Sequence, residues 1–135
     1  NDEAKLSEIT QLADTCVRVL ESQSASAEVF ILLASRAVRD NDYARLDRLA
    51  DGLAERYSAG EIAEVVRQTE VPQIRAIAYE TLAMMPIPNL IPLLDDPLYQ
   101  GIAAAALEQK AYEFDSDEAR DLLDQFDSQM YNRGE

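Results

Sequence analysis

The chain has 135 residues, with 12 lysines and arginines, 26 aspartates and glutamates, no histidine and a formal net charge of −14. A chain of this length buries about two thirds of the surface that its unfolded form exposes, so it needs no disulfide or metal to fold. The acidic charge excludes a phosphate-binding surface for nucleic acid and disfavours binding to anionic membranes. The lack of histidine excludes Ser-His-Asp and Cys-His catalysis and the common zinc sites. No apolar run reaches the ~18 residues of a membrane span.

Two segments before residue 40 have apolar residues at three- and four-residue steps, which is the helical period. The first stripe comprises Leu6, Ile9, Leu12, Ala13, Cys16, Val17 and Leu20, and the second comprises Val29, Phe30, Leu33, Ala34, Ala37 and Val38. We therefore expect residues 1–41 to form an N-terminal helical pair or cap. Cys16 is the only cysteine, and its place on the stripe predicts burial as a small hydrophobe. One thiol gives no sign of an oxidising compartment, so we expect a cytoplasmic protein.

Capping signals mark the helices that follow residue 42. Leu46, Leu49 and Leu53 continue the helical period after a polar turn at 40–42. Ser58 and Glu61 have the spacing of a capping box, in which the serine oxygen accepts from an early backbone N–H. Pro72 suits the first position of the next helix, where its missing N–H is not needed.

Prolines punctuate the segment 86–97. Pro92 is tolerated in a helix only if it lies in the first turn, so we expect a brief helix that starts close to it. Asp96 followed by Pro97 predicts another helix start, with a helical cap and a proline at the first position. A last helix is expected from about Asp115.

The middle of the chain overlays itself when it is shifted by 25 residues. Pro72 then falls on Pro97, residues 77–78 fall on 102–103, and residues 81–82 fall on 106–107. Each unit is a short helix, a proline turn and a longer helix. Units of this kind bury their apolar faces by stacking on one another.

Residues 88–97, Pro-Asn-Leu-Ile-Pro-Leu-Leu-Asp-Asp-Pro, followed by Ile102, the alanines 103–106 and Leu107, resemble a HEAT-like repeat. The short period is also similar to that of the leucine-rich repeat variant. The resemblance covers residues 42–112 and departs at Gln100, where the family has the arginine that Arg75 supplies in the unit before. It implies an all-α, short right-handed α-solenoid of about 7–8 helices in one domain, 1–135, and a scaffold or binding surface.

The predicted partner-binding surface lies on the second helices of the repeats, around Arg75, Tyr79, Tyr99 and Gln100. Arg75 and Tyr79 are four residues apart, so they share a helix face. Tyrosine and arginine are typical interface anchors. The alternative for Tyr79 is a ring that packs at a helix seam with its hydroxyl in water.

The segment 113–135 is predicted to be a C-terminal acidic helix. Residues 108–127 hold eight acidic and two basic residues, a local charge of −6. Asp117, Glu118, Asp121 and Asp124 are candidate contacts for a basic partner, which would bind faster at low salt. A solvated face that favours the positive end of the helix dipole is the alternative.

These observations predict a non-enzymatic protein–protein interaction or scaffold module with a protein partner and no catalytic residues, cofactor or metal. The first alternative is an acidic decoy or chaperone-like protein that binds a basic partner. A carboxylate-based enzyme or small-ligand binder is the third hypothesis. It would need a deep pocket in which carboxylates with raised pKa converge.

Overall fold

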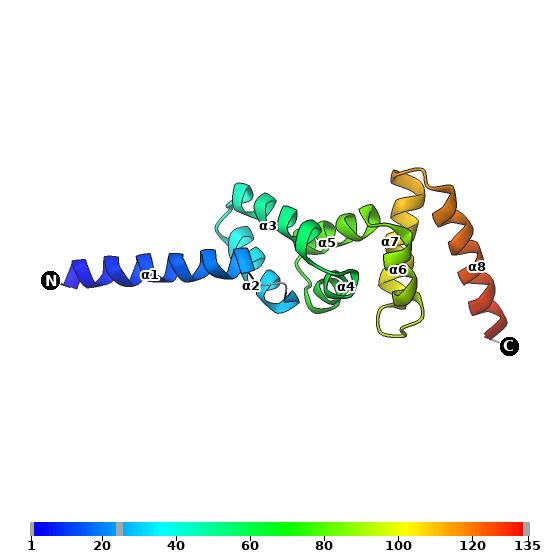
Figure 1. Ribbon diagram of the computed structural model, residues 1–135, viewed down its shortest axis with the longest axis horizontal. Helices are drawn as coiled ribbons and strands as arrows, with labels where there is room; N and C mark the ends of the chain where they lie inside the picture. Colours follow the sequence, from blue (N-terminus) through cyan, green and yellow to red (C-terminus); the bar gives the residue numbers. More distant parts are fainter. Residues whose placement is uncertain (1, 24–25, 134–135) are drawn as a thin grey trace. The chain divides into compact units, whose positions relative to one another are not determined.

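The computed structural model describes residues 2–23 and 26–133, and side chains for residues 2–12 and 26–129. The residues so described form eight helices and no strand, which confirms the all-α fold (Figure 1). Cys16 lies outside the described side chains, so its burial stays a prediction. Contacts divide the chain into two compact units, Asn1–Tyr57 and Ser58–Glu135. The predicted repeat region, 42–112, crosses this division.

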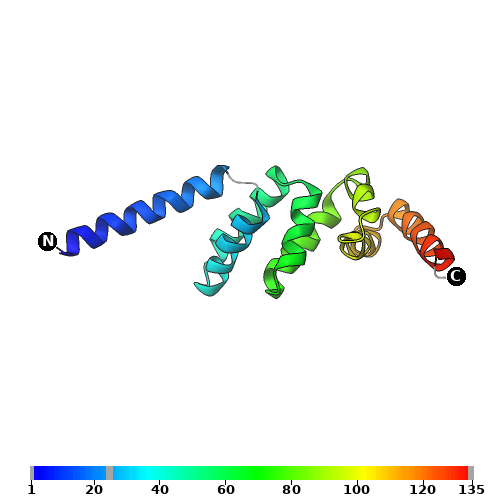
Figure 2. The ribbon, with the colours of Figure 1, turned by 90° about the horizontal axis from the view of Figure 1, so that it is seen from below.

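The first unit contains α1 (Asp2–Gln23), α2 (Ala27–Arg39) and α3 (Tyr43–Arg56). The α2 and α3 helices lie side by side in both views (Figures 1 and 2). Their shared core is formed by apolar side chains at helical spacing: Phe30, Leu33, Leu46, Leu49 and Leu53. The ring of Tyr57 meets Phe30 edge to face with centroids 5.9 Å apart, and its hydroxyl donates to the Ser26 carbonyl at 3.1 Å. This tyrosine therefore ties the end of α3 to the start of α2.

The apolar stripe at the start of α1 is not covered. The side chains of Leu6, Ile9 and Leu12 are 65%, 64% and 66% exposed. These three residues form what we call the open stripe of α1. Their spacing predicts the helix correctly, and they contribute little to the core of the first unit.

The second unit contains α4 (Ala59–Gln68), α5 (Pro72–Met84), α6 (Ile87–Leu94), α7 (Gln100–Glu113) and α8 (Asp117–Arg133). The α4 helix packs on α5, α6 packs on α7, and α7 also contacts α5 and α8. Its core is built from fully buried aliphatic side chains of the first four of these helices: Ile62, Val65, Val66, Ile74, Leu82, Leu90 and Leu107. The α7 helix also contacts α4, so it lies against all four other helices of the unit and organises it.

Several predicted helix starts are confirmed, and two need correction. Ser58 caps α4 by accepting from the Glu61 N–H at 3.2 Å, and α5 begins at Pro72. Pro92 lies inside α6 rather than in a first turn, because α6 already begins at Ile87. Proline at the sixth position of so short a helix removes only one interior hydrogen bond. The predicted start at Asp96 is also wrong, since residues 97–99 form a turn whose Leu98 N–H is bound by the Asp96 carboxylate at 2.9 Å.

Three basic side chains bind the C-terminal carbonyls of a preceding helix. Arg75 of α5 donates to the carbonyls of Val66 and Thr69 at 2.6 and 3.1 Å, at the end of α4. Lys110 of α7 donates to those of Ala83 and Met85 at 2.9 and 2.8 Å, at the end of α5. Arg120 of α8 donates to the Ala111 carbonyl at 2.8 Å, near the end of α7. Because the last carbonyls of a helix lack partners and carry partial negative charge, these cations stabilise each helix end.

Within the described ranges, no single helix is long and apolar enough to cross a membrane. The α5 and α6 helices would pass the same test of length and composition together, across a bend of 114°. Much of their apolar surface belongs to the core of the second unit, where Ile74, Leu82 and Leu90 are fully buried.

Candidate functional site

An open groove of about 540 Å³ lies between α5 and α7, the helices on which the sequence predicts the binding surface. Three residues of each helix line it: Ala76, Tyr79 and Glu80 from α5, and Ala105, Gln109 and Glu113 from α7. Steps of three and four residues place each set on one face of its helix. The two alanines have short side chains, which leave space between the helices. We call this feature the α5–α7 groove.

Carboxylates set the charge of the α5–α7 groove. Glu80 is exposed and has no hydrogen-bond or ion-pair partner in the described part of the chain. Glu113 is also exposed and accepts a hydrogen bond from Gln109 Nε2 at 3.1 Å. Arg75 of α5 and Lys110 of α7 do not neutralise these carboxylates, because both side chains bind backbone carbonyls. The groove therefore presents negative charge beside an apolar floor and one aromatic ring.

Arg75 and Tyr79 lie together, as their spacing predicts. The Arg75 guanidinium carbon is 5.8 Å from the centroid of the Tyr79 ring, a cation–π distance. Because the same guanidinium binds two carbonyls of the preceding helix, Arg75 positions the ring. Tyr79 is half-buried and lines the groove. Of the two, Tyr79 is the residue placed to touch a partner.

Tyr99 lies apart from Tyr79, in a cluster with three residues of α4. Its hydroxyl donates to Glu64 Oε2 at 2.5 Å, across 35 positions of sequence. Glu64 also accepts hydrogen bonds from Arg67 and from Gln68 Nε2, the latter at 2.6 Å. The turn at residues 97–99 thereby fastens the start of α7 to α4. Tyr99 is predicted to contact a partner, but in the structure its hydroxyl is bonded to Glu64 within the second unit.

The hydrogen bonds of the Glu64 cluster shift the pKa values of Glu64, Arg67 and Tyr99. Hydrogen bonds from Arg67, then from Tyr99 and Gln68, favour the charged carboxylate and lower the pKa of Glu64 from 4.5 to about 2. The same hydrogen bond to Glu64 raises the pKa of the Tyr99 phenol. Glu64 therefore stays ionised at any pH near neutrality. This is the behaviour of an ion-pair cluster that holds helices together, rather than of a general acid.

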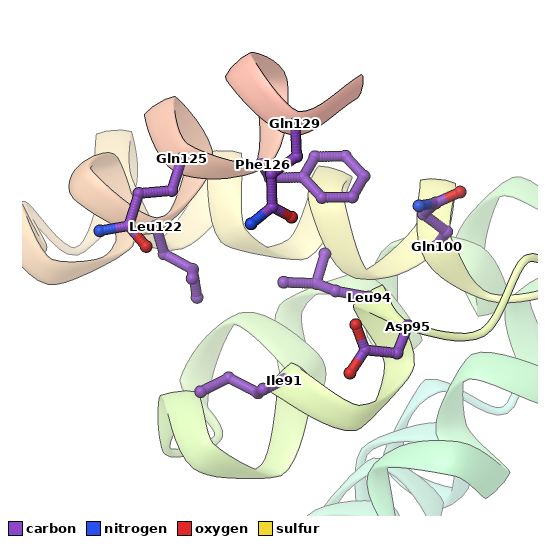
Figure 3. Close-up of a pocket in the computed structure, with 8 residues that line it drawn as sticks. All are labelled: Ile91, Leu94, Asp95, Gln100, Leu122, Gln125, Phe126 and Gln129. Carbon is purple, nitrogen blue, oxygen red and sulfur yellow. The ribbon is translucent and has the colours of Figure 1, made fainter. Parts of the chain in front are cut away.

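Gln100 lies at a second hollow, a pocket of about 110 Å³ among α6, the start of α7, and α8 (Figure 3). Its apolar lining is formed by two pairs of residues, one from each flanking helix: Ile91 and Leu94 of α6, and Leu122 and Phe126 of α8. Its polar lining comprises Asp95, Gln100, Gln125 and Gln129. Figure 3 shows Leu122 and Phe126 extending from α8 toward the side of Leu94. We call this hollow the α6–α8 pocket.

The acidic candidates Asp117, Glu118, Asp121 and Asp124 are all exposed on α8. Arg120 binds Asp117 at 2.8 Å and Asp115 at 2.9 Å, so part of this charge is paired. Asp115 has a positive φ of 51°, in the left-handed region that aspartate tolerates between helices. None of the four candidates lines the groove or the pocket.

The structure thus distributes the predicted residues over four places: Arg75 and Tyr79 at the groove, Tyr99 at the Glu64 cluster, Gln100 at the pocket, and the acids on α8. The groove carboxylates Glu80 and Glu113 were not predicted as one site. The spacing of residues 105, 109 and 113 marks one helix face and was the available signal. That this face lies against residues 76–80 is long-range information, which helical spacing does not contain.

The part of the chain that the structure describes holds no group of three or more acidic, cysteine or histidine side chains able to bind a metal ion. Comparisons of the chain with protein-family models, with curated proteins and with solved structures each find no match.

Proposed function

We propose that the chain is a non-enzymatic protein-interaction module that binds a basic segment of a partner protein in the α5–α7 groove. The observation that carries this proposal is the groove itself, where Tyr79, Glu80 and Glu113 surround a floor of alanines. Tyrosine offers a large amphipathic contact area at a low cost in side-chain entropy. The carboxylates favour lysine and arginine and disfavour acidic partners.

The arrangement proposed for α4–α7 is two stacked HEAT-like helix pairs. Three contacts support it: α4 against α5, α6 against α7, and α5 against α7 between the pairs. The 25-residue shift that overlays Pro72 on Pro97 relates the same helices in sequence. In such stacks the second helices form a continuous surface that binds other chains.

The test is affinity capture from the native organism with the tagged wild type and four tagged variants, followed by mass spectrometry at low and high salt. Tyr79→Ala removes the groove's ring, and a combined Glu80→Gln and Glu113→Gln variant removes its charge. The matched controls are Tyr112→Ala, at a tyrosine that is 78% exposed outside the groove, and Glu108→Gln, at an exposed glutamate of α7. Circular dichroism establishes that each variant keeps its helices.

We expect a partner that the wild type and both controls retain and both groove variants lose. High salt should weaken its capture, because exposed ion pairs are screened. A partner that all variants retain equally contradicts a role for the groove.

A second proposed function is that of an acidic decoy or chaperone-like protein, with Asp117, Glu118, Asp121 and Asp124 contacting a basic partner. The exposure of all four side chains supports it. The pairing of Asp117 with Arg120 reduces the free charge, so we favour the groove. A partner lost on neutralising Asp121 and Asp124 and kept by the groove variants would favour the decoy.

A further inference from the structure

The α6–α8 pocket is a second site of different character, and it shares no lining residue with the α5–α7 groove. The α7 helix contributes to both sites, with Gln100 at the pocket and Ala105, Gln109 and Glu113 at the groove. The apolar residues Leu94 of α6 and Phe126 of α8 both line the pocket and leave space between their helices (Figure 3). Ile91 of α6 also lines the pocket and is 43% exposed. These side chains place apolar surface around the pocket.

The size of the pocket restricts what can fill it. Its volume is about 110 Å³. Pockets for drug-sized ligands and cofactors measure about 300–1,000 Å³, whereas a cavity of about 150 Å³ binds benzene. The α6–α8 pocket therefore has room for one large aliphatic side chain and excludes a nucleotide or another large cofactor.

The polar rim restricts the occupant further. Asp95 is exposed and is the only ionisable group of the lining, so the rim favours a positive charge. Gln100, Gln125 and Gln129 complete it with three carboxamides. A carboxamide both donates and accepts hydrogen bonds, as the backbone of a peptide does. The exposed amides of Gln125 and Gln129 beside an apolar hollow suit a peptide that inserts a side chain, because they can bond to its backbone.

We propose that the α6–α8 pocket receives one leucine-like side chain of a protein segment, with an adjacent lysine or arginine paired to Asp95. The proposal rests on the proposed function only in that the occupant belongs to a protein. An apolar anchor in a pocket, ringed by polar contacts, is the usual arrangement of an interface hot spot. The partner segment is therefore expected to contain an aliphatic residue flanked by basic residues.

The test is a ¹⁵N-NMR titration of the full chain with the capped tripeptide acetyl-Arg-Leu-Arg-amide. We expect shift changes confined to α6, the start of α7, and α8, with millimolar affinity, because one side chain buries little area. Acetyl-Arg-Ala-Arg-amide should bind at least about tenfold more weakly, because it lacks most of the buried apolar group. Acetyl-Gln-Leu-Gln-amide should bind up to about fivefold more weakly, as expected for an exposed ion pair.

Protein variants give the matched controls. Phe126→Ala, at a half-buried position, should abolish the shift changes, and Asp95→Asn should reduce affinity up to about fivefold. Asp127→Asn removes one negative charge from an exposed position of α8 outside the pocket and should leave the affinity unchanged. Unchanged amide spectra away from the substituted residue show that each variant is folded.

Three results would overturn the proposal. The first is equal binding of the leucine and alanine peptides. The second is a set of shift changes centred on the α5–α7 groove and abolished by Tyr79→Ala, which would support the proposed function and reject this pocket. The third is the absence of any shift change at 20-fold molar excess in the millimolar range.

Discussion

The α1 and α2 helices carry similar apolar stripes, yet they differ in what covers them. Phe30 and Leu33 of α2 are 2% and 3% exposed, because α3 and the ring of Tyr57 lie against them. Leu6 and Leu12 of α1 are 65% and 66% exposed. An apolar stripe stabilises a helix only where another element removes it from water. The first three turns of α1 therefore depend on intrinsic helix propensity, whereas α2 is held by its packing.

The largest effect is expected for Phe30→Ala, in the covered stripe. Removing this ring should lower the free energy of unfolding of the first unit by about 3–5 kcal/mol, since it leaves a cavity in the core. Urea unfolding followed by circular dichroism measures the change, with Leu12→Ala as the matched variant in the open stripe of α1. We expect the Leu12 variant to stay within about 0.5 kcal/mol of the wild type. Equal losses would show that the stripe of α1 is covered after all.

The same contrast exists between an arginine that binds backbone carbonyls and one that is exposed. Arg75→Met keeps an apolar stem but leaves the carbonyls of Val66 and Thr69 without their charged donor. We expect a loss of about 1.5–3 kcal/mol in the second unit, the usual effect of hydrogen bonds to a charged group. Arg48→Met, at an exposed position of α3, is the control and should change stability by less than about 0.5 kcal/mol. A thermal melt that fails to separate the two variants would contradict the capping role of Arg75.

A smaller, pH-dependent effect is expected at Glu64. Its folded pKa of about 2 lies below its ordinary value of 4.5, so the charged form stabilises the fold fully above pH 4.5. This contribution is lost as the pH falls from 4.5 toward 2 and the carboxylate gains a proton. The stability difference between the wild type and Glu64→Gln should therefore shrink over this range. Urea unfolding at pH 6, 4 and 3 measures it.

Glu70→Gln is the matched control for the Glu64 variant, since Glu70 is exposed just after α4. Its stability difference from the wild type should change less between pH 6 and pH 3. A Glu64 difference that stays constant with pH would mean that its hydrogen bonds to Arg67 and Tyr99 do not persist in solution.

The smallest effect is expected for Ile9→Ser in the open stripe of α1. Ile9 is 64% exposed, so replacing it by a polar residue should change the free energy of unfolding by less than about 0.5 kcal/mol. Hydrogen exchange gives the same comparison without a substitution. The amides of residues 6–12 should exchange much faster than those of residues 30–37, because fraying needs no loss of packing there.

Features that depend on neighbours in sequence were predictable. The helical period gave the all-α fold, the Ser58 hydroxyl gave the start of α4, and Pro72 gave the start of α5. The interior position of Pro92 was not predictable from a helix rule alone, because one lost hydrogen bond is offset where Leu90, Leu93 and Leu94 are buried. Local signals therefore located the helices and set most of their limits.

The arrangement of the candidate sites depends on contacts between distant residues. Tyr99 is bonded to Glu64, 35 positions earlier, and Lys110 reaches the Ala83 carbonyl, 27 positions earlier. Helical spacing says which residues share a face, but it does not say which face of which helix lies opposite. Arg75 and Tyr79 were found because they are four residues apart on one helix. Glu80 and Glu113 were missed as a pair because they come from two helices.

The three capping cations also determine how the chain should respond to ionic strength. The bonds of Arg75, Lys110 and Arg120 to carbonyls are short and partly buried, so dissolved salt screens them little. The mutual repulsion of a surface with net charge −14 acts over longer distances through water and is screened strongly. Added salt should thus weaken the repulsion between surface carboxylates and leave the bonds of the three capping cations in place. The protein is expected to melt at a higher temperature in molar salt than in dilute buffer.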